Sequence, residues 1–108
     1  MIRGTTPDYI LTLDGVDLSE QTVYVTIKQC QKLLTKTGDE LTIAVDETGS
    51  TISFALTQED TLGLSPGSAS IQVRFIDSEG VARATDTAAL NVEKVLLERV
   101  IEYDDNPA

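Results

Sequence analysis

Few residues in this chain can carry out covalent chemistry. None of the 108 residues is histidine, and Cys30 is the single cysteine. A thiol becomes a nucleophile when a base or a positive charge lowers its pKa, and in an extended strand Lys28 and Lys32 would point to the same side as Cys30. The absence of histidine excludes a histidine-based triad and a histidine-ligated zinc site, and a lone cysteine forms no internal disulfide. We therefore expect Cys30 to be a buried or idle thiol.

Neighbouring carboxylates are the second candidate for catalysis. They occur at Asp39-Glu40, Asp46-Glu47, Glu59-Asp60 and Asp104-Asp105. Two carboxylates can act as general acid and base, but neighbours on a strand point to opposite faces. The chain also lacks tryptophan, which commonly stacks on sugars, and it has no phosphate loop or nucleophile elbow. We interpret these pairs as solvated surface charge and predict that the chain is not an enzyme.

The segment from Asp14 to Glu20 is the strongest candidate for a metal site. Its carboxylates are Asp14, Asp17 and Glu20, and calcium binds several oxygen ligands of this kind. The spacing does not match an EF-hand loop, and a polar connection between strands explains the composition equally simply. We predict no metal and no cofactor, and these three residues are the weak candidates for calcium.

The charge balance excludes further classes of function. Eight Lys and Arg against eighteen Asp and Glu give a net charge of −10 and a pI of about 4.1. Nucleic-acid binders need a basic surface, so we expect no nucleic-acid partner. The apolar runs are far shorter than the roughly 20 residues of a membrane span or the roughly 7–15 of a signal peptide. We expect synthesis in the cytoplasm, with no signal peptide and no membrane insertion.

Alternation of apolar and polar residues predicts the elements that must position any site. It extends over Tyr9–Leu13, Val23–Ile27, Leu41–Val45, Ile52–Leu56, Ile71–Phe75 and, more weakly, Val81–Val92. Clusters of Gly, Asp, Ser and Pro separate these segments, as turns require. The pattern indicates half-buried antiparallel strands. We predict one all-β domain over residues 1–108, an immunoglobulin-like antiparallel β-sandwich.

One segment predicts a short helical turn that crosses between the two sheets. Thr57 can cap the first turn, Asp60 stands at the position of a capping box, and Gly63 can end the helix.

The two ends of the chain are candidates for contact with a protein partner. Residues 1–7 form an N-terminal arm before the first strand, and residues 95–108 form a C-terminal extension. The spacing in 95–103 suits a helix, and a last strand is the alternative. Either end could pack on a neighbouring subunit or complete the edges of its own domain. The predicted contact residues are Ile2, Arg3, Leu96, Leu97, Val100 and Ile101.

Five stretches of the chain carry a family resemblance. They are Met1-Ile-Arg-Gly-Thr-Thr-Pro7, Ile52-Ser-Phe-Ala-Leu-Thr-Gln-Glu-Asp-Thr-Leu62, Ile71-Gln-Val-Arg74, Gly80-Val-Ala82 and Val92-Glu-Lys-Val-Leu96. Together they resemble a family of small proteins encoded among the tail and baseplate genes of siphophages and prophages of Firmicutes. The opening heptapeptide and the run Leu56-Thr-Gln-Glu-Asp-Thr-Leu62 are the distinctive ones. The chain departs from the family at Glu93, where glycine would be expected. The resemblance supplies no catalytic residue.

The resemblance implies a non-enzymatic structural or adaptor protein of a phage tail or baseplate, located in the virion. Such a protein would act through assembly with other tail proteins or with copies of itself as a homo-oligomer. The alternative is an immunoglobulin-like module that binds carbohydrate or calcium and helps to recognise a host surface. Scarce aromatic residues count against a sugar site, since only Tyr9, Tyr24 and Tyr103 are available as tyrosines.

Overall fold

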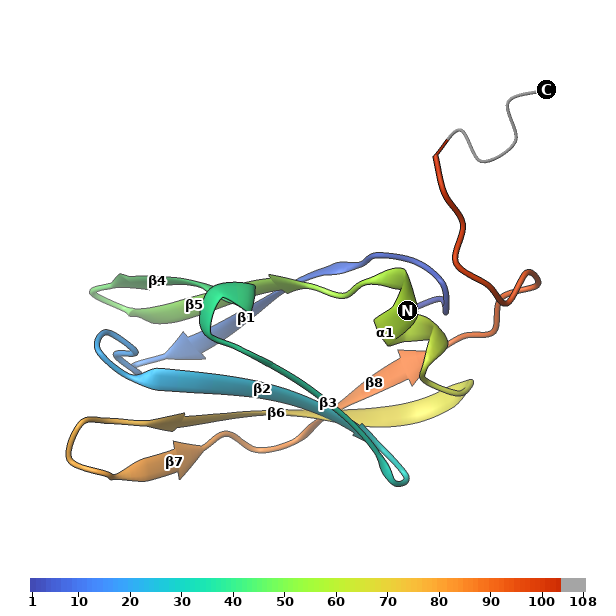
Figure 1. Ribbon diagram of the computed structural model, residues 1–108. Coiled ribbons are helices and arrows are strands. Elements are labelled where there is room, and N and C mark those ends of the chain that lie inside the picture. Colours follow the sequence, from blue (N-terminus) through green and yellow to red (C-terminus); the bar gives the residue numbers. More distant parts are fainter. Residues whose placement is uncertain (104–108) are drawn as a thin grey trace.

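Two antiparallel sheets face each other in a β-sandwich, as predicted (Figure 1). The computed structural model describes residues 1–103. One sheet has three strands in the order β1 (Asp8–Asp14), β5 (Gly49–Ala55) and β4 (Thr42–Asp46). The other has β3 (Lys32–Thr37), β2 (Thr22–Gln29) and β6 (Gly67–Ile76), with β7 (Ala82–Ala84) and β8 (Ala88–Val92) both paired to β6. Two short helices, η1 (Gly38–Glu40) and α1 (Gln58–Leu62), connect the sheets.

The strand order is that of an immunoglobulin-like sandwich. β1, β5 and β4 stand where strands B, E and D of that fold pair, and β3, β2 and β6 stand where C′, C and F pair. β7 and β8 together take the place of the last strand, G. The chain therefore crosses between the sheets after β1, after β3 and after β5.

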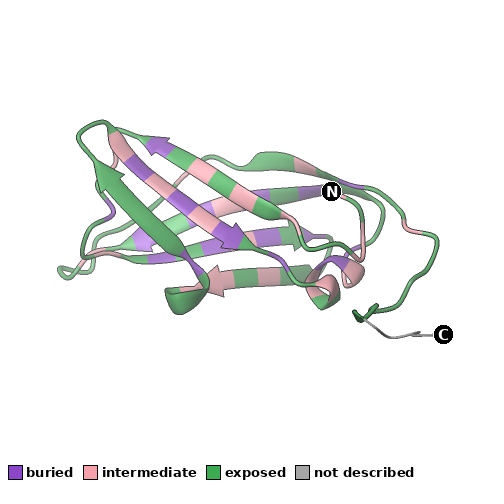
Figure 2. Cartoon of the chain, turned by 90° about the horizontal axis from the view of Figure 1, so that it is seen from above, coloured by how far each residue is buried: buried purple, intermediate pink, exposed green. Residues whose placement is uncertain are grey.

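The core lies between the sheets and is mainly aliphatic. Inward residues alternate with outward ones along β2, β5 and β6, as Figure 2 shows by colour. Ile27 and Ile52 are almost completely buried, and the rings of Tyr9 and Phe54 stack with centroids 5.5 Å apart. Burial raises the pKa of Tyr9. Each fully buried aliphatic side chain stabilises the fold by about 1.5–3 kcal/mol before conformational entropy is counted.

Alternation in the fourth strand is a weaker guide to burial. Ile43 and Val45 do face inward, since they pair with the inward-facing Ile52 and Ser50, but they remain 36% and 41% exposed. The reason is position: β4 is an edge strand of the smaller sheet, so only part of its inner side is covered.

Strand β3 and its hairpin turn were not predicted by the pattern. Lys32 pairs with Gln29, so Cys30 and Gln31 form a two-residue turn rather than part of an extended strand. Cys30 has a φ of 54° and its thiol is exposed. Of the two alternatives for Cys30, a buried thiol is therefore wrong. Lys28 and Lys32 do not lie beside it on one strand face either, because the chain reverses at this residue.

The left-handed backbone of Cys30 gives a stability prediction. This conformation is unfavourable for most L-residues, but asparagine tolerates it. Cys30→Asn is expected to raise the free energy of unfolding by about 0.5–1 kcal/mol, measured by urea denaturation under reducing conditions. Gln31→Asn is the matched control and should change stability little, because Gln31 is not among the positive-φ residues. Equal effects of the two substitutions would contradict the explanation.

The weak pattern over residues 81–92 reflects an interrupted strand. Ala84 pairs with Arg74, but Ala88 pairs with Ile71, so the outer strand contains one extra residue between these positions. Thr85 lies between β7 and β8, and its Oγ1 accepts a hydrogen bond from the Val73 amide of β6 at 3.1 Å. This β-bulge shifts the alternation by one residue, which is why the sequence pattern fades there.

The predicted helical turn is confirmed as α1. Thr57 Oγ1 accepts a hydrogen bond from the Asp60 amide at 3.0 Å, and the Asp60 carboxylate accepts one from the Thr57 amide at 2.9 Å. Gly63 is the C-cap. Neither α1 nor any other helix within residues 1–103 has the length and apolar character needed to cross a bilayer.

Candidate docking site at the joined chain ends

The N-terminal arm lies beside the end of the last strand. Ile2 forms a parallel bridge with Glu93, in which the Arg3 amide donates to the Glu93 carbonyl at 3.0 Å and the Glu93 amide donates to the Met1 carbonyl at 2.7 Å. The terminal ammonium group adds a bond to the Asn91 carbonyl at 2.8 Å. The two candidate ends, more than 90 positions apart in sequence, therefore meet at one end of the sandwich (Figure 1).

Helix α1 holds the arm through a buried hydroxyl. The Thr61 side chain is completely buried, and its Oγ1 accepts a hydrogen bond from the Gly4 amide at 2.9 Å. The same hydroxyl donates to the Thr5 carbonyl at 2.9 Å. Gly4 has a φ of 77°, which suits glycine, and a side chain added at this position would contact Leu62. The arm is thereby fixed against the helix through the hydroxyl of a fully buried residue.

Arg3 links three parts of this end of the molecule. Its guanidinium group forms an ion pair with Glu98 and donates to the Leu62 carbonyl at the end of α1, the latter at 2.8 Å. The Arg3 side chain is only 14% exposed, whereas Glu98 is 61% exposed. Arg3 was predicted as a partner contact, and the structure places it beneath the C-terminal segment, where it positions that segment.

The chain from 94 to 103 is neither helix nor strand, so both alternatives drawn from its spacing are wrong. Its stabilising contacts come instead from side chains elsewhere. Gln58 of α1 binds the backbone of Ile101 twice, donating from Nε2 to the carbonyl and accepting at Oε1 from the amide, both at 2.8 Å. These bonds and the Arg3–Glu98 pair hold an irregular segment near α1, a geometry that periodicity does not encode. Residues 104–108 of the predicted extension lie outside the described residues.

Large apolar side chains gather on this end and face solvent. The exposed fractions are 45% for Ile2, 100% for Leu96, 53% for Leu97, 38% for Val100 and 53% for Ile101. Sequence reasoning missed Tyr103 as a member of this set, although its ring is 96% exposed. We call Ile2, Leu96, Leu97, Val100, Ile101 and Tyr103 the terminal apolar patch. Patches of exposed apolar side chains are typical of protein–protein contact sites.

A second set of contacts ties α1 to β3. Lys36 Nζ lies 2.8 Å from the Asp60 carboxylate and 3.5 Å from that of Glu40, and its side chain is only 12% exposed. The hydrogen bond to Asp60 raises the pKa of Lys36, against the effect of burial. Burial alone would raise the pKa of Asp60, but hydrogen bonds from Lys36 and Thr57 outweigh it and lower that pKa. The contact between α1 and β3 is therefore held partly by charge.

The weak calcium candidates are not brought together. The Asp17 carboxylate accepts hydrogen bonds from the amide and hydroxyl of Ser19, which lower its pKa. Asp14 ends β1, and Glu20 stands in the following loop with a φ of 58°. Within residues 1–103, no three Asp, Glu or Cys side chains form a group that could hold a metal ion. The Asp17 contacts instead stabilise the loop between β1 and β2.

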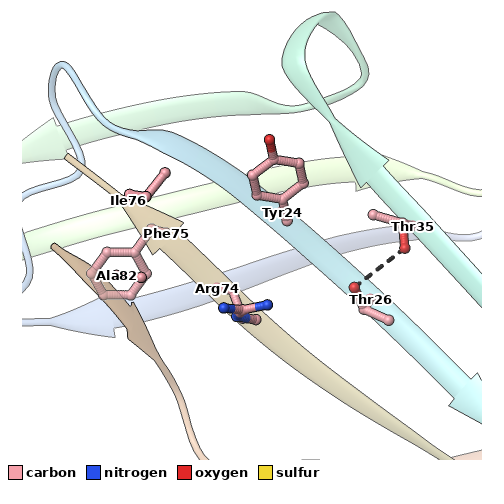
Figure 3. Close-up of a pocket in the computed structure, with 7 residues that line it drawn as sticks. All are labelled: Tyr24, Thr26, Thr35, Arg74, Phe75, Ile76 and Ala82. Carbon is pink, nitrogen blue, oxygen red and sulfur yellow. Dashed lines mark hydrogen bonds between the residues drawn. The ribbon is translucent and has the colours of Figure 1, made fainter. Parts of the chain in front are cut away.

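A shallow hollow of about 370 Å³ lies on the outer face of the five-stranded sheet (Figure 3). Tyr24 and Thr26 of β2 line it together with Arg74 and Ile76 of β6. The hydroxyls of Thr26 and Thr35 lie 3.3 Å apart, within hydrogen-bond distance. The hollow is open, and one cationic side chain, Arg74, lines it together with two aromatic ones, Tyr24 and Phe75.

No protein-family model matches the chain, and the search of curated proteins gives no match. The features that bear on function are therefore the joined ends and the outer faces of the two sheets.

Proposed function

We propose that this chain is a non-enzymatic structural or adaptor protein of a phage tail or baseplate, located in the virion. It acts by docking its joined ends on another tail protein. The sequence resemblance supports the assignment to a phage tail or baseplate. The terminal apolar patch is the observation that supports docking on another protein.

The patch is built as a contact surface on a rigid base. Its side chains are exposed, while the polar groups that position them, such as Thr61 and Arg3, are buried or nearly so. A partner that covers the patch removes apolar area from water, at about 25 cal/mol per Å² before the costs of association. The irregular backbone of 94–103 can adjust to that partner without loss of the sheets.

The test is co-purification with candidate tail and baseplate proteins encoded in the same genome. Deletion of residues 96–108, or the double variant Leu96→Asp and Leu97→Asp, is expected to reduce capture at least about tenfold, because charge enters the centre of the contact. Val81→Asp is the control, since Val81 is 42% exposed in the loop between β6 and β7, outside the patch. Surface substitutions of this type change stability by only about 0.5 kcal/mol. Undiminished capture by both patch variants would overturn the proposed docking mode.

A further inference from the structure

Charge is divided between the two outer faces of the sandwich. Asp8, Asp14 and Asp46 stand on the outer face of the three-stranded sheet, and the strands of that sheet contain no Lys or Arg. The five-stranded sheet has the opposite character. Lys28 and Arg74 face outward from it, and its strands contain no Asp or Glu, although the chain has eighteen. In an acidic protein, this sheet is therefore a locally cationic face.

The side chains on both outer faces are mostly small, which favours close packing. Threonine, serine and alanine predominate on them, with a few larger apolar side chains that remain exposed. Ile10 is 71% exposed in the middle of β1, and Leu33 of β3 is 64% exposed on the opposite face. The hollow between Tyr24 and Arg74 offers a shallow receptacle for an apolar side chain such as Ile10 (Figure 3). Sheets with small side chains can stack about 10 Å apart.

We propose that the outer face of the three-stranded sheet of one copy docks on the outer face of the five-stranded sheet of a second copy. Opposite charges then meet, Asp8 and Asp14 against Lys28 and Arg74. Pairing of two identical faces would instead bring like charges together, which is unfavourable. The contact joins unlike faces, so repetition gives a ring or an open series rather than a closed twofold dimer. This inference goes beyond the proposed docking function, because it uses neither the terminal apolar patch nor residues 96–108.

The contact is small, and this sets the expected strength. Three strands about 4.8 Å apart and about seven residues long, at about 3.4 Å per residue, cover roughly 340 Å² on each copy. A standard stable interface buries about 800 Å² per partner, so one such contact is weak. The net charge of −10 on each copy adds repulsion. We expect monomers at micromolar concentration and association near about 1 mM, the range in which many copies bound to one scaffold would operate.

Sedimentation equilibrium from about 10 µM to about 1 mM in 150 mM salt, roughly physiological, tests the proposal. The acidic variant carries Lys28→Glu and Arg74→Glu, and the basic variant carries Asp8→Lys and Asp14→Lys. Each variant alone has two outer faces of like charge and should associate at least about tenfold more weakly than the natural chain. These four side chains have no ion pair among the described residues, so the fold should tolerate the changes, which circular dichroism would verify.

An equimolar mixture of the two variants is the decisive measurement. Each interface in an alternating series then joins an acidic face to a basic one, so the mixture should regain association that neither variant shows alone. A natural chain that stays monomeric at 1 mM, or a mixture no more associated than its parts, would overturn the proposal. The chain lacking residues 96–108 should self-associate as the full chain does, which separates this inference from the docking of the terminal apolar patch.

Discussion

Replacement of Thr61 by valine is expected to lower the free energy of unfolding by about 2–4 kcal/mol, a large share of the roughly 5–15 kcal/mol typical of a domain. The two side chains have similar shape, so packing is nearly preserved and the hydroxyl alone is lost. That hydroxyl is the partner of the Gly4 amide and the Thr5 carbonyl, each at 2.9 Å, in a position with no solvent exposure. A buried polar group without a partner costs about 1–3 kcal/mol.

Thr61→Ser is the matched control, because it keeps the hydroxyl and removes a methyl group, at a cost of about 1 kcal/mol. Urea denaturation gives the stabilities, and hydrogen exchange at the Gly4 amide reports whether the arm is still fixed. The valine variant should exchange this amide faster than the serine variant. If valine proves as stable as serine, Thr61 does not hold the arm in the way described.

The sheets could be predicted from the sequence because one face of most strands is buried. Alternation of Val23, Val25 and Ile27 has a period of two, and burial confirms it. The same reasoning failed for β3, where Leu33 and Leu34 are adjacent and two lysines flank them. Only Leu34 packs against the core, and the turn before β3 contains neither glycine nor asparagine. β3 is an edge strand with a mixed pattern, and an atypical turn precedes it. Alternation of apolar and polar residues therefore does not predict it.

Helix α1 was predictable although it is only five residues long. Its cap is local, since Thr57 and Asp60 satisfy each other's backbone amides within one turn. The terminal apolar patch could be predicted only as two unrelated ends. Its geometry depends on contacts such as Arg3 with Glu98 and Gln58 with Ile101, separated by 95 and 43 positions. A single sequence carries no local signal for such pairs.

The two proposed surfaces differ in the kind of contact they can make. The terminal apolar patch carries exposed aliphatic side chains on irregular backbone, which suits a partner of different shape. The outer sheet faces carry mostly small side chains and are opposite in charge, which suits repetition of the same chain. In the proposed assembly, the first contact fixes the chain to a scaffold and the second orders neighbouring copies on it. α1 and the arm stabilise the first surface without covering the second.

Replacement of Asp60 by alanine is expected to lower the free energy of unfolding by about 2 kcal/mol at neutral pH. The carboxylate caps α1 through the Thr57 amide and forms the ion pair with Lys36, whose atoms lie 2.8 Å apart. Loss of a capping residue costs about 1 kcal/mol, and the partly buried pair contributes a similar amount. Asp60→Asn separates the two effects, since its amide oxygen can still accept from Thr57 but carries no charge.

The effect of Asp60→Asn should depend on pH in a direction fixed by the two pKa shifts. The pKa of Asp60 is lowered from 3.8, so its contribution is complete above that value and is lost as the pH falls through the lower pKa of the folded state. The pKa of Lys36 is raised from 10.5, so the pair persists until the pH rises through that raised value. The stability difference between the natural chain and Asp60→Asn should therefore be constant from about pH 5 to 9 and shrink below about pH 4.

Urea denaturation midpoints at each pH measure this stability difference. Asp46, whose pKa is lowered by hydrogen bonds from Thr48 and Gly49, titrates in both proteins and cancels in the difference. A difference that persists unchanged at pH 2 would show that the charge on Asp60 does not stabilise the fold.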